Sequence, residues 1–165
     1  MADGTLFETP IESRAGAITL TVPRSKTPHK IGTTSEAMFL AACVAMDIPV
    51  SIPYGINQRY DFIVDRGGLR RVQVKTAHLI STDKTLAFNT HSAVWNYGGT
   101  VRRTGDRRYI GQIDDFGVYS PQLKTVYLVP IERFGTKLRG YLRVTLFARE
   151  TRPYLWAGDF LIYRF

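Results

Sequence analysis

Two short segments of the chain bring together an acid, an amide and an amine. Asp61 lies in the run Tyr60–Asp65, and Gln73 and Lys75 lie in the run Arg71–Thr76. Both runs alternate polar and apolar residues, which predicts two strands of a β-hairpin. Since side chains at i and i+2 share a face, Gln73 and Lys75 point the same way. Carboxylate and amide oxygens can bind a hard divalent cation, so the hairpin is a candidate site.

The length of the hairpin loop decides whether Asp61 joins this face. A two-residue loop, Gly67–Gly68, would pair Asp61 with Val74 and divide the group between the two faces of the sheet. A three-residue loop, Arg66–Gly68, with a glycine in the left-handed conformation pairs Asp61 with Gln73 instead. On their own, Gln73 and Lys75 are most often part of a solvated strand face.

An acid on one strand and Gln-x-Lys on the next resemble the PD-(D/E)XK nuclease superfamily. Its pattern is an acid, then an acid or glutamine, any residue and a lysine, and Tyr60 stands where the family has a proline. The resemblance extends roughly over residues 30–143. The segments Arg71–Thr76 and Tyr127–Pro130 are similar to the branch of group I intron-encoded homing endonucleases that carry glutamine in the second acidic position.

This resemblance implies an α/β (α+β) fold with a restriction-endonuclease-like core, in which helices flank a mixed β-sheet. We therefore expect a nuclease-like core at residues 30–150, between an N-terminal extension at 1–29 and a C-terminal tail at 151–165. Within the extension, Ala17–Val22 alternates like a strand.

The best helical pattern runs from Thr34 to Met46 and ends before Pro49, with apolar residues at helical spacing. Thr33 and Glu36 fit a capping box at its start. The resemblance gives Glu36 a second reading, as an acid that the helix carries to the metal, and both readings stay open. The other expected elements are strands at Val50–Pro53, Leu86–Trp95, Thr125–Pro130 and Tyr141–Phe147, and a short helix at Tyr109–Phe116.

The resemblance also assigns roles in magnesium-dependent phosphodiester hydrolysis with one or two Mg²⁺ ions. Asp61 is the central ligand, Gln73 contributes its amide oxygen and Val74 its backbone carbonyl. Lys75 lies beside the attacking water, and Glu36 restores the negative charge that Gln73 lacks. The predicted catalytic set is thus Glu36, Asp61, Gln73 and Lys75.

Charge points to the same kind of partner. The chain of 165 residues has a net charge of +8 and a pI near 9.8, which implies an acidic partner, nucleic acid first, although a soluble basic protein is the alternative. The resemblance makes double-stranded DNA the expected partner. Arginine pairs bind phosphates and guanine edges well, although surface arginines are common. The candidate DNA contacts are Arg70, Arg71, Arg102, Arg103, Arg107 and Arg108.

Three functions agree with these observations. The first is a homing-type endonuclease that cuts both strands as a homo-oligomer, a dimer or tetramer, because one such site cuts one strand. The second is a Holliday-junction resolvase or other structure-specific nuclease with the same residues. The third is a non-catalytic nucleic-acid-binding module, since Gln73 replaces an acid.

The cysteine and histidine residues argue against an internal disulfide and against a histidine metal site. One cysteine, Cys43, cannot form an internal disulfide, and it lies among small apolar residues that suggest burial. The three histidines lack metal-ligand spacing. There is no apolar run of the ~20 residues that a membrane span needs and no signal peptide, so we expect an intracellular, cytoplasmic protein.

Overall fold

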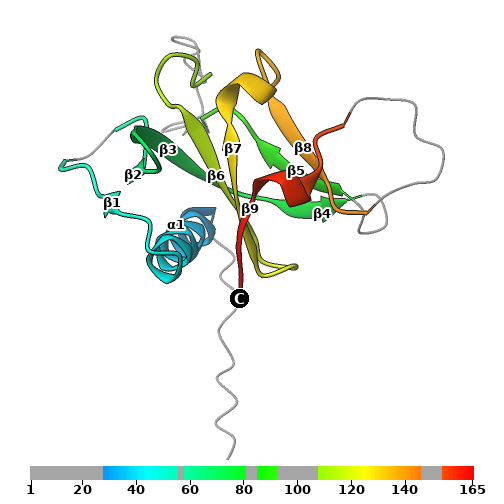
Figure 1. The fold of residues 1–165 in the computed structure, drawn as a ribbon. Coiled ribbons are helices and arrows are strands. Elements are labelled where there is room, and N and C mark those ends of the chain that lie inside the picture. The colour runs from blue at the N-terminus through cyan, green and yellow to red at the C-terminus, as the bar shows by residue number, and fades with distance from the viewer. Residues whose placement is uncertain (1–27, 56–57, 81–84, 93–107, 146–153) are drawn as a thin grey trace, which may run out of the picture.

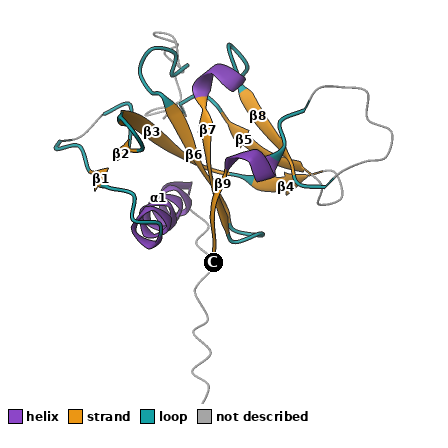
Figure 2. Cartoon of the chain, viewed as in Figure 1, coloured by secondary structure: helices purple, strands orange, loops and turns teal. Residues whose placement is uncertain are grey.

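A computed structural model describes residues 28–55, 58–80, 85–92, 108–145 and 154–165. Strands dominate it, with one long helix at the beginning (Figure 2). In chain order the elements are α1 (Pro28–Ala45), β1 (Val50–Ser51), β2 (Phe62–Asp65), β3 (Leu69–Thr76), β4 (His78–Ile80), β5 (Thr85–Asn89), β6 (Asp115–Ser120), β7 (Thr125–Pro130), the 3-10 helix η1 (Ile131–Arg133), β8 (Arg139–Arg143), the 3-10 helix η2 (Ala157–Phe160) and β9 (Leu161–Arg164).

The strands form two sheets. The main sheet has six strands in the order β1-β2-β3-β6-β7-β9, and β4, β5 and β8 form a smaller sheet. Strands β3 and β6 are parallel and their neighbours are antiparallel, so the main sheet is mixed as expected. Helix α1 packs against one face of the main sheet and the smaller sheet against the other (Figure 1). The predicted α/β (α+β) class is confirmed, although a second sheet, rather than a second long helix, covers the other face of the described structure.

Helix α1 packs its apolar side on β2, β3, β6 and β7. Phe39 is fully buried and stacks on Phe62, with ring centroids 5.6 Å apart. Gly117 on β6 allows this approach, because a Cβ atom there would lie 2.6 Å from the Phe39 ring. The helix is therefore held at a fixed distance from the central strands. Cys43 is buried in the same cluster, as expected.

The start of α1 differs from the prediction. The helix begins at Pro28, a residue that suits the first turn because its missing N–H would have no partner there. Thr33 is therefore inside the helix, where its hydroxyl donates to the carbonyl of His29 at 3.1 Å. The predicted capping box is therefore wrong, because Glu36 lies near the middle of α1 and does not cap its N-terminus.

A second core cluster lies between the main sheet and the smaller one. Phe116 of β6 makes edge-to-face contacts with Phe88, Tyr109 and Phe134. Strand β3 leads directly into β4 through the buried Ala77, whose N–H donates to the Tyr119 carbonyl at 2.8 Å. One continuous segment thus carries the candidate residues of β3 and then enters the second sheet.

The other predicted elements are confirmed only in part. Strand Thr125–Pro130 is confirmed as β7, and the predicted strands near Val50, Leu86 and Tyr141 are present as the shorter β1, β5 and β8. The predicted helix Tyr109–Phe116 is wrong: Gly111 adopts φ 74° in a turn, and β6 starts at Asp115. The predicted tail contains β9, which pairs with β7 as an edge strand of the main sheet. The strand predicted at Ala17–Val22 lies outside the described residues.

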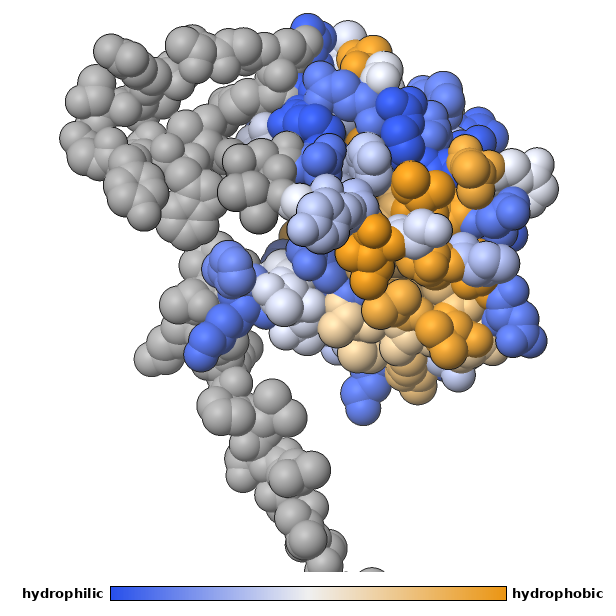
Figure 3. All heavy atoms as spheres, turned by 90° about the vertical axis from the view of Figure 1, so that its left-hand side faces the viewer, coloured by the Kyte–Doolittle hydropathy of each residue, from blue (hydrophilic) through white to orange (hydrophobic). Residues whose placement is uncertain are grey.

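The side of the molecule that carries β1 and α1 exposes large apolar side chains. Val44 and Met46 at the end of α1 and Ile52 after β1 are each at least half exposed. Figure 3 shows this side, where apolar residues gather in one continuous area bordered by hydrophilic ones.

Candidate active site

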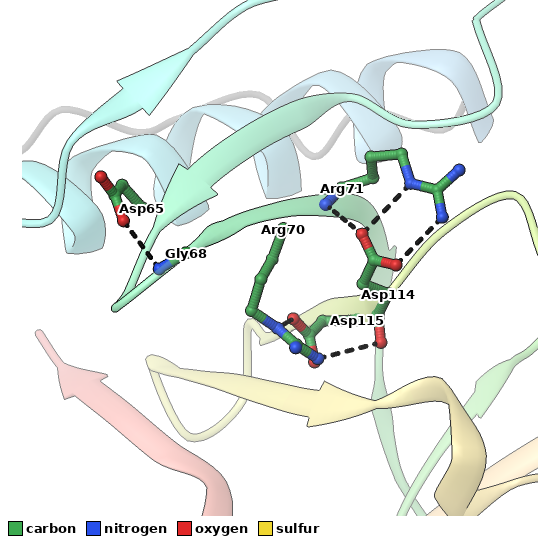
Figure 4. Close-up of polar contacts among 6 residues, drawn as sticks. All are labelled: Asp65, Gly68, Arg70, Arg71, Asp114 and Asp115. Carbon is green, nitrogen blue, oxygen red and sulfur yellow. Dashed lines mark hydrogen bonds and ion pairs between the residues drawn. The ribbon is translucent and has the colours of Figure 1, made fainter.

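The hairpin of β2 and β3 has the three-residue loop. Asp65 pairs with Leu69 and Phe62 with Val72, which leaves Arg66, Gly67 and Gly68 in the loop. Gly67 has φ 73°, the left-handed conformation that the three-residue loop requires. The Asp65 carboxylate accepts a hydrogen bond from the Gly68 N–H at 3.0 Å, so Asp65 stabilises the turn (Figure 4). The register that brings Asp61 beside Gln73 is therefore present.

Asp61 lies just beyond the regular ladder, and its side chain turns toward β3. Its N–H donates to the Val72 carbonyl at 2.8 Å. Its carboxylate Oδ2 accepts from the Val74 N–H at 2.7 Å and from Gln73 Nε2 at 2.5 Å. Asp61, Gln73 and the backbone of Val74 thus meet at one point of the sheet.

The Asp61 carboxylate is poorly compensated for its burial. Burial raises its pKa from 3.8 to about 6, and the nearby Glu36 carboxylate adds to the rise. The hydrogen bond from Val74 and the charge of Lys75 oppose the shift but do not cancel it. A half-buried anion of this kind favours a cation beside it.

Lys75 lies two residues after Gln73 on the same face of β3, and its side chain extends into the same site. Its ammonium group donates to the Tyr109 hydroxyl at 2.9 Å and lies 4.7 Å from the centre of the Tyr109 ring. Burial lowers the Lys75 pKa from 10.5 to about 8, with a further lowering by Arg59. Asp61 and Glu36 counteract this because their negative charges favour the ammonium form.

Glu36 approaches the site from α1. Its charge affects the pKa of both Asp61 and Lys75. The preceding residue, Ser35, is buried, and its hydroxyl lies 2.5 Å from that of Thr76, the residue after Lys75. This contact fixes the middle of α1 against the end of β3. Because their charges shift one another's pKa values, Glu36, Asp61 and Lys75 belong to one electrostatic cluster.

Removing the charge of Glu36 therefore tests whether it acts at this site. Since Glu36 does not cap α1, Glu36→Gln should leave the melting temperature nearly unchanged. If Glu36 is a metal ligand, DNA cleavage should fall about tenfold at low magnesium and more magnesium should partly restore it, because the carboxylate becomes a neutral amide. Cleavage rates across a magnesium titration measure this. The exposed Glu132→Gln is the matched control, and equal magnesium curves for the two variants would return Glu36 to a purely structural role.

Sequence reasoning missed two residues of the cluster, Arg59 and Tyr109. The Arg59 guanidinium carbon lies 4.4 Å from the centre of the Tyr109 ring, and one of its nitrogens donates to the Arg108 carbonyl at 3.0 Å. Its Nε donates to the Gln112 amide oxygen. No local pattern marks these contacts, because they join segments about fifty residues apart.

Two of the predicted DNA-contacting arginines form ion pairs within the protein (Figure 4). Arg70 pairs with Asp115, whose side chain is 2% exposed, and Arg71 pairs with Asp114 at 3.0 Å. The Asp114 carboxylate also accepts from the Arg71 backbone N–H at 2.7 Å, and these contacts lower its pKa. The pairs join the start of β3 to the start of β6, so we expect a structural contribution from both arginines.

The remaining predicted contacts are Arg102, Arg103, Arg107 and Arg108. Arg102, Arg103 and Arg107 fall outside the described residues. Arg108 is the first described residue after this gap. Its backbone forms an isolated antiparallel β-bridge with His91, and its carbonyl accepts a hydrogen bond from Arg59.

The donor set of the site fits Mg²⁺ in its chemistry. Among the described residues, no three His, Cys, Asp or Glu side chains form a metal-binding group, which agrees with a glutamine in place of the second strand acid. The site offers two carboxylates, from Asp61 and Glu36, together with the amide oxygen of Gln73 and the carbonyl of Val74. All are oxygen donors, as Mg²⁺ prefers. The Gln73 amide now donates through Nε2, and rotation about its last bond exchanges nitrogen for oxygen.

The fold and this hairpin define a nuclease of the PD-(D/E)XK type. The sequence model of the PD-(D/E)XK endonuclease family matches residues 26–162, which is most of the chain. The chain therefore belongs to the PD-(D/E)XK endonuclease family, whose members generally use divalent metal ions. The match extends to residue 162, within the edge strand β9 of the main sheet.

Among solved structures, the fold is similar to that of the bacterial homing endonuclease I-Ssp6803I. The TM-score is 0.60 at 18% sequence identity, and the alignment covers 82% of this chain and 88% of the other. No curated protein matches the sequence. In the described parts of the chain, no helix is both long and apolar enough to cross a membrane.

Proposed function

We propose that this protein is a magnesium-dependent DNA endonuclease of the homing type. One observation carries the proposal: a half-buried Asp61 carboxylate, held by Gln73 and Val74, lies in one electrostatic cluster with Lys75 and Glu36. Hydrolysis of a phosphodiester needs a water that can attack, neutralised phosphate charge and a stabilised leaving oxygen. A cluster that combines oxygen ligands with a half-buried amine meets these needs.

Each residue contributes one part of the mechanism. When bound, Mg²⁺ supplies a Lewis acid for the phosphate and makes a water more acidic. Asp61, Glu36, the Gln73 amide oxygen and the Val74 carbonyl are the groups that would hold it. Lys75 orients the attacking water and places its positive charge beside the charge that develops on the phosphate. Burial of the Lys75 amine strengthens this effect, because water screens it less.

The homing assignment and the oligomer belong to the same proposal. The Gln73-Val74-Lys75 sequence and the fold shared with I-Ssp6803I support the homing type over other branches of the family. One site cuts one strand, so cleavage of both strands requires at least two copies of this chain, arranged around the approximate two-fold axis of the DNA.

A selection experiment tests the function directly. The protein is incubated with Mg²⁺ and a library of random duplexes, and the cut ends are sequenced; the same reaction is run on a four-way junction. We expect one long preferred duplex site cut on both strands. Cleavage confined to the junction would identify a resolvase, and binding without any cleavage would identify a non-catalytic module.

DNA affinity should depend steeply on salt, because each phosphate contacted by a lysine or arginine releases counterions. The log–log slope should be about −0.9 per contact. Alanine substitution of Arg102 and Arg103, or of Arg107 and Arg108, should flatten that slope by roughly one unit per lost phosphate contact. Affinity for all sequences should fall alike, as measured by fluorescence anisotropy over a salt titration.

A different pattern would indicate a different contact. If these arginines bind bases, preference at particular positions should relax by about 1–3 kcal/mol each while the slope stays the same. If both double variants bind and cut like the parent at every salt concentration, these four arginines do not contact the DNA.

A further inference from the structure

Tyr109 is buried beside the catalytic cluster but belongs to none of the predicted catalytic or metal-binding residues. Its side chain is 4% exposed and packs edge-to-face on Phe116, with ring centroids 5.8 Å apart. Its hydroxyl accepts the hydrogen bond from Lys75 Nζ at 2.9 Å. Burial raises the Tyr109 pKa to about 12, so the phenol stays neutral at physiological pH.

The turn that carries Tyr109 is anchored to the site by Arg59. Arg59 donates to the Gln112 side chain and to the Arg108 carbonyl, which lie on either side of Tyr109. Within the turn, the N–H groups of Gln112 and Ile113 donate to the Tyr109 carbonyl at 2.9 and 3.2 Å. Arg59 lies two residues before Asp61, so the segment that supplies the acid also fixes the tyrosine that meets the lysine.

A lysine side chain has four rotatable bonds and loses much conformational freedom when it is fixed at one point. A buried hydrogen-bond partner reduces that freedom before DNA binds. We propose that Tyr109 is a positioning residue that holds the Lys75 amine for catalysis, with Arg59 and Gln112 fixing the turn that presents it. The inference rests on the proposed function, since it assigns Tyr109 a role through Lys75.

Tyr109→Phe tests this directly, because it removes the hydroxyl and keeps the ring against Phe116 and Arg59. Single-turnover cleavage at saturating DNA and Mg²⁺ should become about tenfold slower or more, the loss expected for one hydrogen bond to a charged group. The dissociation constant for DNA, measured without metal, and the melting temperature should change little. A rate loss that merely follows a fall in melting temperature or DNA affinity would overturn the proposal.

Tyr127→Phe is the matched control. Tyr127 is also buried, and its hydroxyl accepts a hydrogen bond from Thr125 at 2.9 Å, outside the cluster. This variant should lower the melting temperature somewhat and leave the cleavage rate at saturating DNA unchanged. Equal rate losses in the two variants would show a general packing effect and refute a positioning role.

A second variant changes Gln112, which lies in the same turn as Tyr109. Gln112→Ala removes one partner of Arg59 without changing Tyr109 or Lys75, and it should slow cleavage in the same direction but less. Failure of the inference differs from failure of the function. If the parent cuts, Lys75→Ala does not, and Tyr109→Phe cuts like the parent, only the positioning role is wrong; if the parent does not cut, the endonuclease assignment is wrong.

Discussion

Asp61→Asn should abolish cleavage and at the same time make the metal-free protein more stable at neutral pH. Cleavage is lost because an amide replaces the central carboxylate of the proposed metal site. Stability rises because the ionised Asp61 is buried at a cost, which its pKa of about 6 records. The gain should be on the order of 1–3 kcal/mol, or roughly 2–4 °C in Tm per kcal/mol.

The pH dependence fixes the sign of this effect. The ordinary pKa of the Asp61 carboxyl is 3.8, so between pH 3.8 and about 6 the folded protein binds a proton that the unfolded chain has released. Stability from this group therefore falls as pH rises through that window, and its full cost is present at pH 7. Melting curves from pH 4 to 8 in EDTA should converge for parent and Asp61→Asn at the acidic end.

The matched control is Asp65→Asn, on the same strand. Asp65 is exposed, and an asparagine can still accept the hydrogen bond from the Gly68 N–H. This variant should cut like the parent and show no stabilisation at pH 7. Cleavage by Asp61→Asn at saturating Mg²⁺ would refute the site assignment.

Lys75→Ala should lower the cleavage rate by about 10²–10⁴-fold while DNA binding remains close to that of the parent. In the proposed mechanism the lysine provides the positive charge beside the attacking water, whereas we expect binding to depend on many separate basic residues. The exposed Lys137→Ala removes the same charge elsewhere and should leave cleavage unchanged. Single-turnover rates and metal-free binding assays separate the two effects.

The pH profile of the parent gives a further check on Lys75. Cleavage should decline above about pH 8, where the buried ammonium loses its proton, and below about pH 6, where Asp61 gains one. More Mg²⁺ should move the acidic decline to lower pH, because only the carboxylate form binds the cation. The alkaline decline should be missing from the residual activity of Lys75→Ala; an unchanged decline would assign it to another group.

The hairpin could be predicted from the sequence because its signals are local. Alternation defines both strands, and Gly67 at φ 73° allows the three-residue loop that places Asp61 beside Gln73. Strand β7 could be predicted as well, since Thr125, Val126, Tyr127 and Val129 are β-branched or aromatic and indicate a buried strand.

Long-range contacts override local signals elsewhere. Thr33 and Glu36 match a capping box, yet the helix continues back to Pro28, and the hydroxyl contact of Ser35 with Thr76 fixes its middle to the sheet. Residues 109–116 contain a helical spacing, but Gly111 turns the chain there and Asp114 pairs with Arg71. The roles of Tyr109 and Arg59 depend on such distant partners, so no spacing in the sequence reveals them.

The parallel pairing of β3 with β6 has a consequence for the order in which the site assembles during folding. The β2–β3 hairpin closes over a short loop and can form early, but Val72 meets its β6 partner Asp115 only after a connection of some forty residues has closed. Asp61 and Gln73 can therefore come together with the hairpin. Lys75 gains its tyrosine partner only when the slower closure is complete, and it is this late step that should limit the rate at which refolding protein recovers activity.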